Sequence, residues 1–129
     1  MNSPQHIATR FYDAMASGSV GDLEETVRQH FSESATLARP ESLPGGGVLS
    51  GAPEIMAFLG KAAGKVPLVV NKLVADESGE NVFASVTITL AGRDTEAVEW
   101  WTFTGERVAS IRAFYWDTAA MLGVAQARS

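Results

Sequence analysis

The stretch AVEWWTFTGERVASIRAFYW, residues 97–116, decides the fold class of this 129-residue chain. It holds two extended runs, Ala97–Phe103 and Arg107–Trp116, rich in the aromatic and β-branched residues that strands favour. The three residues between the runs, at 104–106, are typical of a tight turn. The stretch therefore predicts two neighbouring antiparallel strands.

Two further strands are predicted upstream of this pair. The segments Leu68–Val74 and Val82–Leu90 are rich in valine, isoleucine and threonine. Polar turns at 76–81 and 91–94 connect them to each other and to the next strand. Short turns between consecutive strands predict an antiparallel meander.

The N-terminal part of the chain has helical periodicity. Ser3 and Pro4 are a typical helix opening, because a hydroxyl caps the first turn and proline suits its first position. Gly18 and Gly21 are expected to end this helix, and Asp22 is expected to cap a second one. Apolar residues recur every four positions, at Ile7, Phe11 and Met15 in the first helix and at Leu23, Val27 and Phe31 in the second.

The middle of the chain is mixed. Residues 34–39 are expected to be extended, and 40–51 to form a loop whose glycine run is either a flap at a cavity mouth or an irregular turn. A third, short helix is predicted to begin near Pro53 and to end at Gly60 or Gly64. Its apolar face consists of Ile55, Phe58 and Leu59. Because helices precede strands, the class is α+β, and residues 1–129 form a single domain.

Composition excludes several classes of function. The net charge of -5 argues against nucleic-acid and membrane-surface partners, because both carry negative charge. The chain has no cysteine, so it has no disulfide and no thiolate chemistry. The N-terminus lacks the basic and apolar regions of a signal peptide, which favours a cytoplasmic location. His6 and His30 stand without a carboxylate cluster, so no metal site is predicted.

Several segments resemble the SnoaL-like and ketosteroid-isomerase-like families of the nuclear transport factor 2-like superfamily. They are the helix at 11–18, the run at 30–37, the third helix at 51–59 and the paired strands at 99–103 and 108–115. The resemblance covers nearly the whole chain. It implies a cone in which N-terminal helices pack on a curved, mostly antiparallel sheet and enclose a pocket.

The resemblance also implies positions for functional residues. Where ketosteroid isomerases carry an aspartate base, this chain has Arg39. The isomerase tyrosine falls on Phe11, with Tyr12 one residue further along, and the protonated carboxylic acid falls on Glu99. The superfamily includes isomerases, cyclases, dehydratases, epoxide hydrolases and non-catalytic binders, so the fold does not specify an activity.

Glu99, Arg39 and Tyr12 are the candidate catalytic residues. A carboxyl group in a desolvated pocket has a raised pKa and can exchange protons near neutral pH. Arg39 would either clamp a substrate carboxylate or stabilise an enolate, or else form an inert ion pair with Glu99. Candidates for the apolar wall that binds substrate are Phe11, Met15, Phe58, Trp101, Phe103, Ile111 and Tyr115.

The opposite face of the last two strands is also apolar. Trp100, Phe114 and Trp116 alternate with the inward residues and would lie on the outer face of the sheet. Exposed apolar patches mark interaction sites, so the sequence predicts a homodimer through this face. Packing of a C-terminal segment on the same face is the alternative.

Together these features favour a cofactor-independent acid/base enzyme of isomerase, cyclase or dehydratase type. Its substrate would be a small hydrophobic molecule with a carbonyl group. The alternatives are a non-catalytic small-ligand-binding or dimerisation module, and hydration of the epoxide hydrolase type.

Overall fold

The computed structural model describes residues 3–43, 46–90, 92–119 and 121–122. The helices among these residues are α1 (Pro4–Ser17), α2 (Val20–His30) and α3 (Ala52–Ala62). The strands are β1 (Phe31–Arg39), β2 (Gly47–Ser50), β3 (Leu68–Ala75), β4 (Asn81–Leu90), β5 (Arg93–Thr104) and β6 (Arg107–Tyr115).

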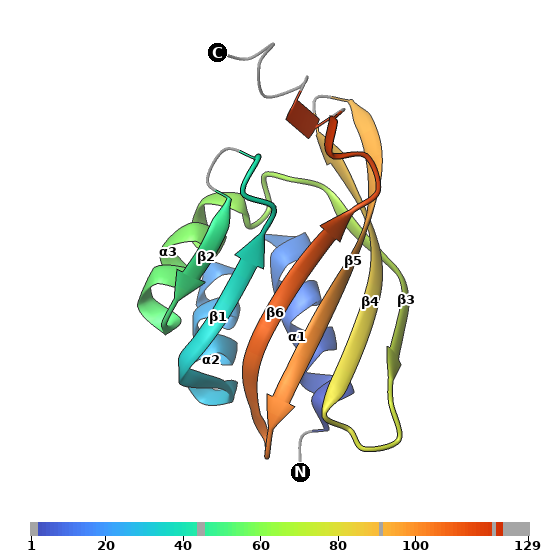
Figure 1. Cartoon of the computed structure of the whole chain (residues 1–129). Coiled ribbons are helices and arrows are strands. Elements are labelled where there is room, and N and C mark those ends of the chain that lie inside the picture. The colour runs from blue at the N-terminus through green and yellow to red at the C-terminus, as the bar shows by residue number, and fades with distance from the viewer. Residues whose placement is uncertain (1–2, 44–45, 91, 120, 123–129) are drawn as a thin grey trace.

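The strands form one curved sheet in the order β2-β1-β6-β5-β4-β3. Neighbouring strands are antiparallel, except that β1 runs parallel to β6. The three helices cover one face of this sheet, and α1 crosses its middle (Figure 1). The predicted α+β class and the predicted meander are therefore confirmed. Within the described residues, no helix has the length and apolar character needed to span a membrane.

The connection between the first two helices is shorter than the sequence predicted. Gly18 alone ends α1, in a left-handed conformation with φ 74°, and α2 begins at Val20 with Ser19 as its N-cap. The predictions for Gly21 as a terminator and Asp22 as a cap were wrong, because both residues lie in the first turn of α2. Phe31 is buried as expected, but it is the first residue of β1 rather than part of the helix.

The sequence also missed some regular structure. β2 lies inside the predicted loop at 40–51 and pairs with β1 from Thr36 to Arg39. Four residues are too short to show a periodic pattern, so this strand is specified by its partner rather than by local preference. Residues 44 and 45, which belong to the predicted flap, lie outside the described residues. α3 ends at Ala62, between the two glycines that were expected to end it.

An aromatic cluster fills the space between α1 and the sheet. Phe11 lies edge-on to Trp101, with ring centroids 4.9 Å apart, and Phe31 and Phe103 pack on the same indole. Trp101 is fully buried. Aromatic rings bury large apolar areas, so this cluster is a major source of stability and fixes how α1 sits on β5.

Two glycines allow the ends of α1 and α3 to touch. Gly18 and Gly64 both have positive φ, 74° and 73°. A Cβ atom at Gly64 would lie 2.7 Å from the Cα of Gly18, closer than real Cβ atoms approach. The Gly64 amide also donates to the Met15 carbonyl oxygen at 2.9 Å. Only glycine at position 64 permits this close backbone approach.

We expect Gly64→Ala to destabilise the fold far more than Gly79→Ala. Both glycines have φ 73°, but nothing lies within 4 Å of a Cβ at Gly79. The control should lower the unfolding free energy by about 1 kcal/mol through backbone strain alone. Gly64→Ala should lower it by about 3 kcal/mol, because overpacking adds to that strain. Urea unfolding measures both, and equal losses would show that the helix contact contributes nothing.

Candidate functional site

A cavity of about 150 Å³ lies between the helices and the inner face of the sheet. Its wall is almost wholly apolar, with Glu99, Arg39, Tyr12 and Tyr115 as the polar or charged exceptions. The lining residues are Phe11, Tyr12, Met15, Leu37, Arg39, Phe58, Leu59, Ala62, Val66, Leu68, Val86, Ile88, Leu90, Ala97, Glu99, Ile111, Tyr115 and Met121. An apolar cavity with a few converging polar groups is typical of a small-molecule site.

The predicted wall is found in this lining with two exceptions. Trp101 and Phe103 face inward as expected, but both are buried in the aromatic cluster and do not line the cavity. The cavity extends along only part of β5. Ala97 and Glu99 line the cavity, whereas the next inward residues, Trp101 and Phe103, lie beneath α1. Assigning these two residues to the wall was therefore wrong, although their face was assigned correctly.

Glu99 is held by a chain of two hydrogen bonds. The Trp101 indole N–H donates to the Tyr12 hydroxyl oxygen at 2.9 Å, and that hydroxyl donates to Oε1 of Glu99 at 2.6 Å. Because an indole nitrogen can only donate, Trp101 directs the Tyr12 proton toward Glu99. The carboxyl group therefore has a fixed orientation at the cavity wall.

The environment of Glu99 makes its carboxyl group a weaker acid than usual, with a raised pKa. Burial raises its pKa above the ordinary 4.5, while the hydrogen bond from Tyr12 and the charge of Arg39 act in the opposite direction. The side chain keeps partial exposure only because it faces the cavity. Burial and the nearby carboxylate raise the pKa of Tyr12 well above 10, so Tyr12 remains a donor.

Arg39 lies across the cavity at the end of β1. Its Nε donates to the Tyr115 hydroxyl oxygen at 3.3 Å, and its Cζ lies 5.0 Å from the centre of the Phe58 ring. Burial raises the pKa of Tyr115, against the lowering effect of Arg39. Glu99 is thus hydrogen-bonded to Tyr12 and Arg39 to Tyr115, and the positive charge of Arg39 acts on the Glu99 carboxyl group.

The histidines lie away from the cavity. His30 Nε2 is buried and accepts or donates no hydrogen bond among the described residues. Burial, with the charges of Arg10 and Arg107, lowers the pKa of His30 and favours the neutral ring. No group of three potential metal-ligating side chains was found in the part of the chain that the structure describes.

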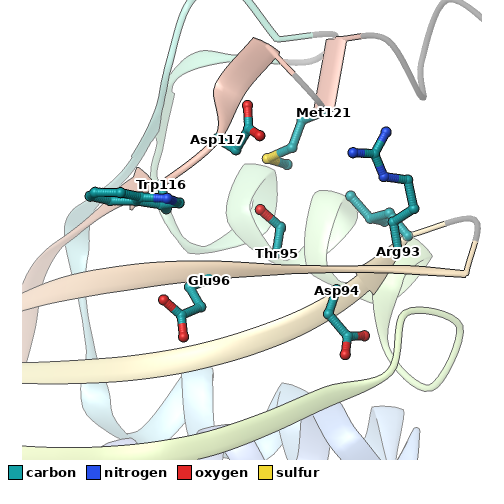
Figure 2. A pocket seen from close by; sticks show the side chains of 8 residues that line it. Arg93, Asp94, Thr95, Glu96, Trp116, Asp117 and Met121 are labelled. Carbon is teal, nitrogen blue, oxygen red and sulfur yellow. The ribbon is translucent and has the colours of Figure 1, made fainter.

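Neither the buried position of Met121 nor the hollow beside the cavity was predicted from the sequence. Leu90 and Met121 line both the cavity and a shallow hollow beside it, in which Trp116 and Arg93 stand on either side of Met121 (Figure 2). Met121 follows the last strand, where no periodic pattern predicted a buried position. It is nevertheless buried, and so separates the cavity from this hollow.

Comparison with known proteins is informative at the level of structure. No model of a known protein family matches the sequence. No curated protein matches it either. Many solved structures do, at low sequence identity.

Three of these structures illustrate the range. An NTF2-like protein from Burkholderia xenovorans LB400 is 25% identical, with 96% of this chain and 98% of that chain covered and a TM-score of 0.71. A protein from Jannaschia sp. CCS1, provisionally described as a SnoaL-like polyketide cyclase, is 16% identical over 94% and 90%, with a TM-score of 0.74. A protein from Kribbella flavida DSM 17836, provisionally described as a ketosteroid isomerase, is 18% identical over 87% and 76%, with a TM-score of 0.71.

These likenesses extend over most of the chain, at TM-scores of 0.71 to 0.74. The chain therefore has the nuclear transport factor 2-like fold, which it shares with SnoaL-like and ketosteroid-isomerase-like proteins.

Proposed function

We propose that this protein is a cofactor-independent acid/base enzyme that moves a proton next to a carbonyl group of a small hydrophobic substrate. The observation that carries the proposal is Glu99, a half-buried carboxyl group with raised pKa that is fixed by Tyr12 at the wall of an apolar cavity. Groups tuned in this way are concentrated at catalytic sites. The solved structures that share this fold include two proteins provisionally described as a SnoaL-like polyketide cyclase and a ketosteroid isomerase, which supports such chemistry.

The cavity volume limits the substrate. An apolar cavity of about 150 Å³ is large enough for benzene. We therefore propose that the part of the substrate held in the cavity is about one ring in size, with its wall contacts made by Phe11, Met15, Phe58 and Ile111. A fused four-ring substrate would need the wall to move.

The proposed reaction divides the work between two charged side chains. Tyr12 occupies Oε1 of Glu99, so Oε2 is the oxygen that meets the ligand. As the carboxylate, Glu99 takes the proton from the α-carbon, and the electrons of the broken C–H bond form an enolate. Arg39, with Tyr115 beside it, stabilises the enolate oxygen. Protonated Glu99 then returns the proton to the same or a neighbouring carbon.

A second candidate is a non-catalytic binder of small apolar molecules. It is favoured by Arg39, which stands where the isomerases carry their base. The two proposals differ in whether bound ketones exchange α-protons.

We expect Glu99→Gln to abolish proton exchange while leaving the fold intact. A melting screen of small ketones and cyclic enones first identifies a ligand, since saturation at about 100 times the Kd raises stability by about 2.7 kcal/mol. Exchange of its α-protons in D₂O is then followed by NMR. The variant keeps an acceptor for Tyr12 but should lose about 100-fold or more in rate.

Glu96→Gln is the matched control, because Glu96 lies on the same strand but is exposed. It should exchange at the wild-type rate. Undiminished exchange in Glu99→Gln would overturn the catalytic role, and ligand binding without exchange in the wild type would favour the binder.

Stability should also depend on pH through Glu99. The pKa of Glu99 is higher in the folded than in the unfolded chain. At pH values above 4.5, the folded state therefore holds more protons at this group than the unfolded state does. The Glu99 contribution is therefore fully present at low pH and is lost as pH rises through the raised pKa. Glu99→Gln lacks this loss, so its unfolding free energy should gain on that of the wild type as pH rises above 4.5. Parallel pH curves would contradict the shift.

We further propose that the chain forms a homodimer through the outer face of the sheet. Phe114 is 45% exposed on this face, and Trp100 stacks on the exposed Phe83 with ring centroids 5.9 Å apart. Trp116, which follows the end of β6, is 86% exposed. Val98 lies beside Phe114 on this face and is 42% exposed. An apolar face of this kind is typical of protein contacts, and a second copy would cover it.

Val98→Lys should convert the dimer into a monomer, because burying an unpaired ammonium group in an interface is costly. Val20→Lys is the control, since Val20 is 43% exposed but lies on α2, away from the sheet. Sedimentation equilibrium gives the mass of each variant. A wild-type monomer, or equal dissociation by both variants, would rule out this face.

A further inference from the structure

The inner face of β5 continues from the cavity into the hollow beside it. Side chains alternate along a strand, so the odd-numbered residues from 93 to 99 point to the same side of the sheet. Glu99 and Ala97 line the cavity, whereas Thr95 and Arg93 line the hollow. Figure 2 shows Thr95 and Arg93 on the side of β5 where Met121 lies. The hollow, of about 180 Å³, is therefore an extension of the cavity along the same strand.

The neighbouring strand, β4, has the same continuity. Val86, Ile88 and Leu90 line the cavity, and Leu90 lines the hollow as well. Leu90 pairs with Arg93 of β5, so both strands pass from one space to the other at the same level. A strand rises about 3.3 Å per residue, which puts Thr95 about 13 Å from Glu99 along β5. A ligand that reaches from Glu99 into the hollow is therefore longer than one ring.

The Met121 side chain divides the two spaces. It is 7% exposed and lines both of them. The other described residues that line the cavity lie in helices, in strands or between α3 and β3, whereas Met121 follows the last strand. Methionine is unbranched and flexible, so this part of the wall can be displaced without moving a strand or a helix.

The opposite end of the cavity is closed by polar contacts. A separate groove beside the ends of β1 and β6 shares Arg39 and Tyr115 with the cavity. Arg39 Nε donates to the Tyr115 hydroxyl oxygen at 3.3 Å, and its Cζ lies 5.0 Å from the centre of the Phe58 ring. A ligand that extends toward the groove would break these contacts. Extension past Met121 displaces only an apolar side chain.

The hollow is better suited to a neutral group than to an anion. Its lining contains one arginine, Arg93, and three acids, Asp94, Glu96 and Asp117. Asp94 and Glu96 point to the other side of β5 in Figure 2, but charges separated by less than about 8 Å are only partly screened. Trp116 adds an exposed indole, which offers an aromatic ring a partner.

We infer that Met121 is the specificity-determining residue that limits the length of the ligand. Its side chain confines the ligand to about one ring, and its removal opens the hollow to a second, neutral ring. This inference rests on the proposed function, since it concerns the substrate of the same cavity. Met121 has no part in the proposed proton transfer.

The test compares two ketones that differ by one ring, acetophenone and 4-acetylbiphenyl. Calorimetry gives their Kd values for the wild type and for Met121→Ala, Met15→Ala and Met121→Leu. Met121→Ala should shift the preference toward 4-acetylbiphenyl about tenfold relative to the wild type, because the second ring is then removed from water in the hollow.

The other two variants are matched controls. Met15→Ala removes the same atoms from a part of the cavity wall that does not border the hollow, so it should change both Kd values alike. Met121→Leu nearly conserves the side-chain volume and should keep the wild-type preference.

An equal shift in Met15→Ala and Met121→Ala would show that any loss of wall volume suffices, and would overturn the role of Met121. No shift in Met121→Ala, with acetophenone still bound, would also overturn it while leaving the proposed function intact. If neither ketone binds to any of the four proteins, the proposed function fails, and the inference fails with it.

Discussion

The chain of hydrogen bonds from Trp101 through Tyr12 to Glu99 is the interaction on which the site depends. A carboxyl group in an apolar cavity is costly unless it is hydrogen-bonded, and Tyr12 supplies the bond at 2.6 Å. Tyr12 can do so because the buried Trp101 indole occupies its oxygen. The same three side chains join α1 to β5, so the packing of the helix on the sheet and the orientation of Glu99 are set together.

The parallel pairing of β1 with β6 is the second constraint. Every other neighbouring pair in the sheet is antiparallel and can follow its partner through a short turn, but β1 arrives from α2 and ends at Arg39. The end of β1 therefore brings one charged side chain to the cavity, close to Tyr115 of β6. Glu99 therefore comes from the antiparallel meander, whereas Arg39 comes from β1, the strand that pairs with the meander in parallel.

Much of this arrangement follows from the sequence. Alternation along 97–116 correctly placed Glu99 inward and Trp100 outward, because side-chain direction in a strand depends only on parity. Parity does not say how far a cavity extends, so Trp101 and Phe103 could not be separated from Ala97. β2 and the buried Met121 depend on contacts with distant segments and left no local pattern. The tyrosine partners of Glu99 and Arg39 likewise depend on contacts between distant segments and left no local pattern.

The contact of Gly18 with Gly64 has a consequence for how this cavity can change. Met15 lies just before the first glycine, and Ala62 and Val66 flank the second, and all three line the cavity. The separation of the two helix ends is set there by backbone atoms alone. Larger or smaller side chains at the three flanking positions would therefore alter the capacity of the cavity without moving its frame. A scaffold of this kind can change the shape of its cavity by single substitutions, with the Glu99 carboxyl group left in place.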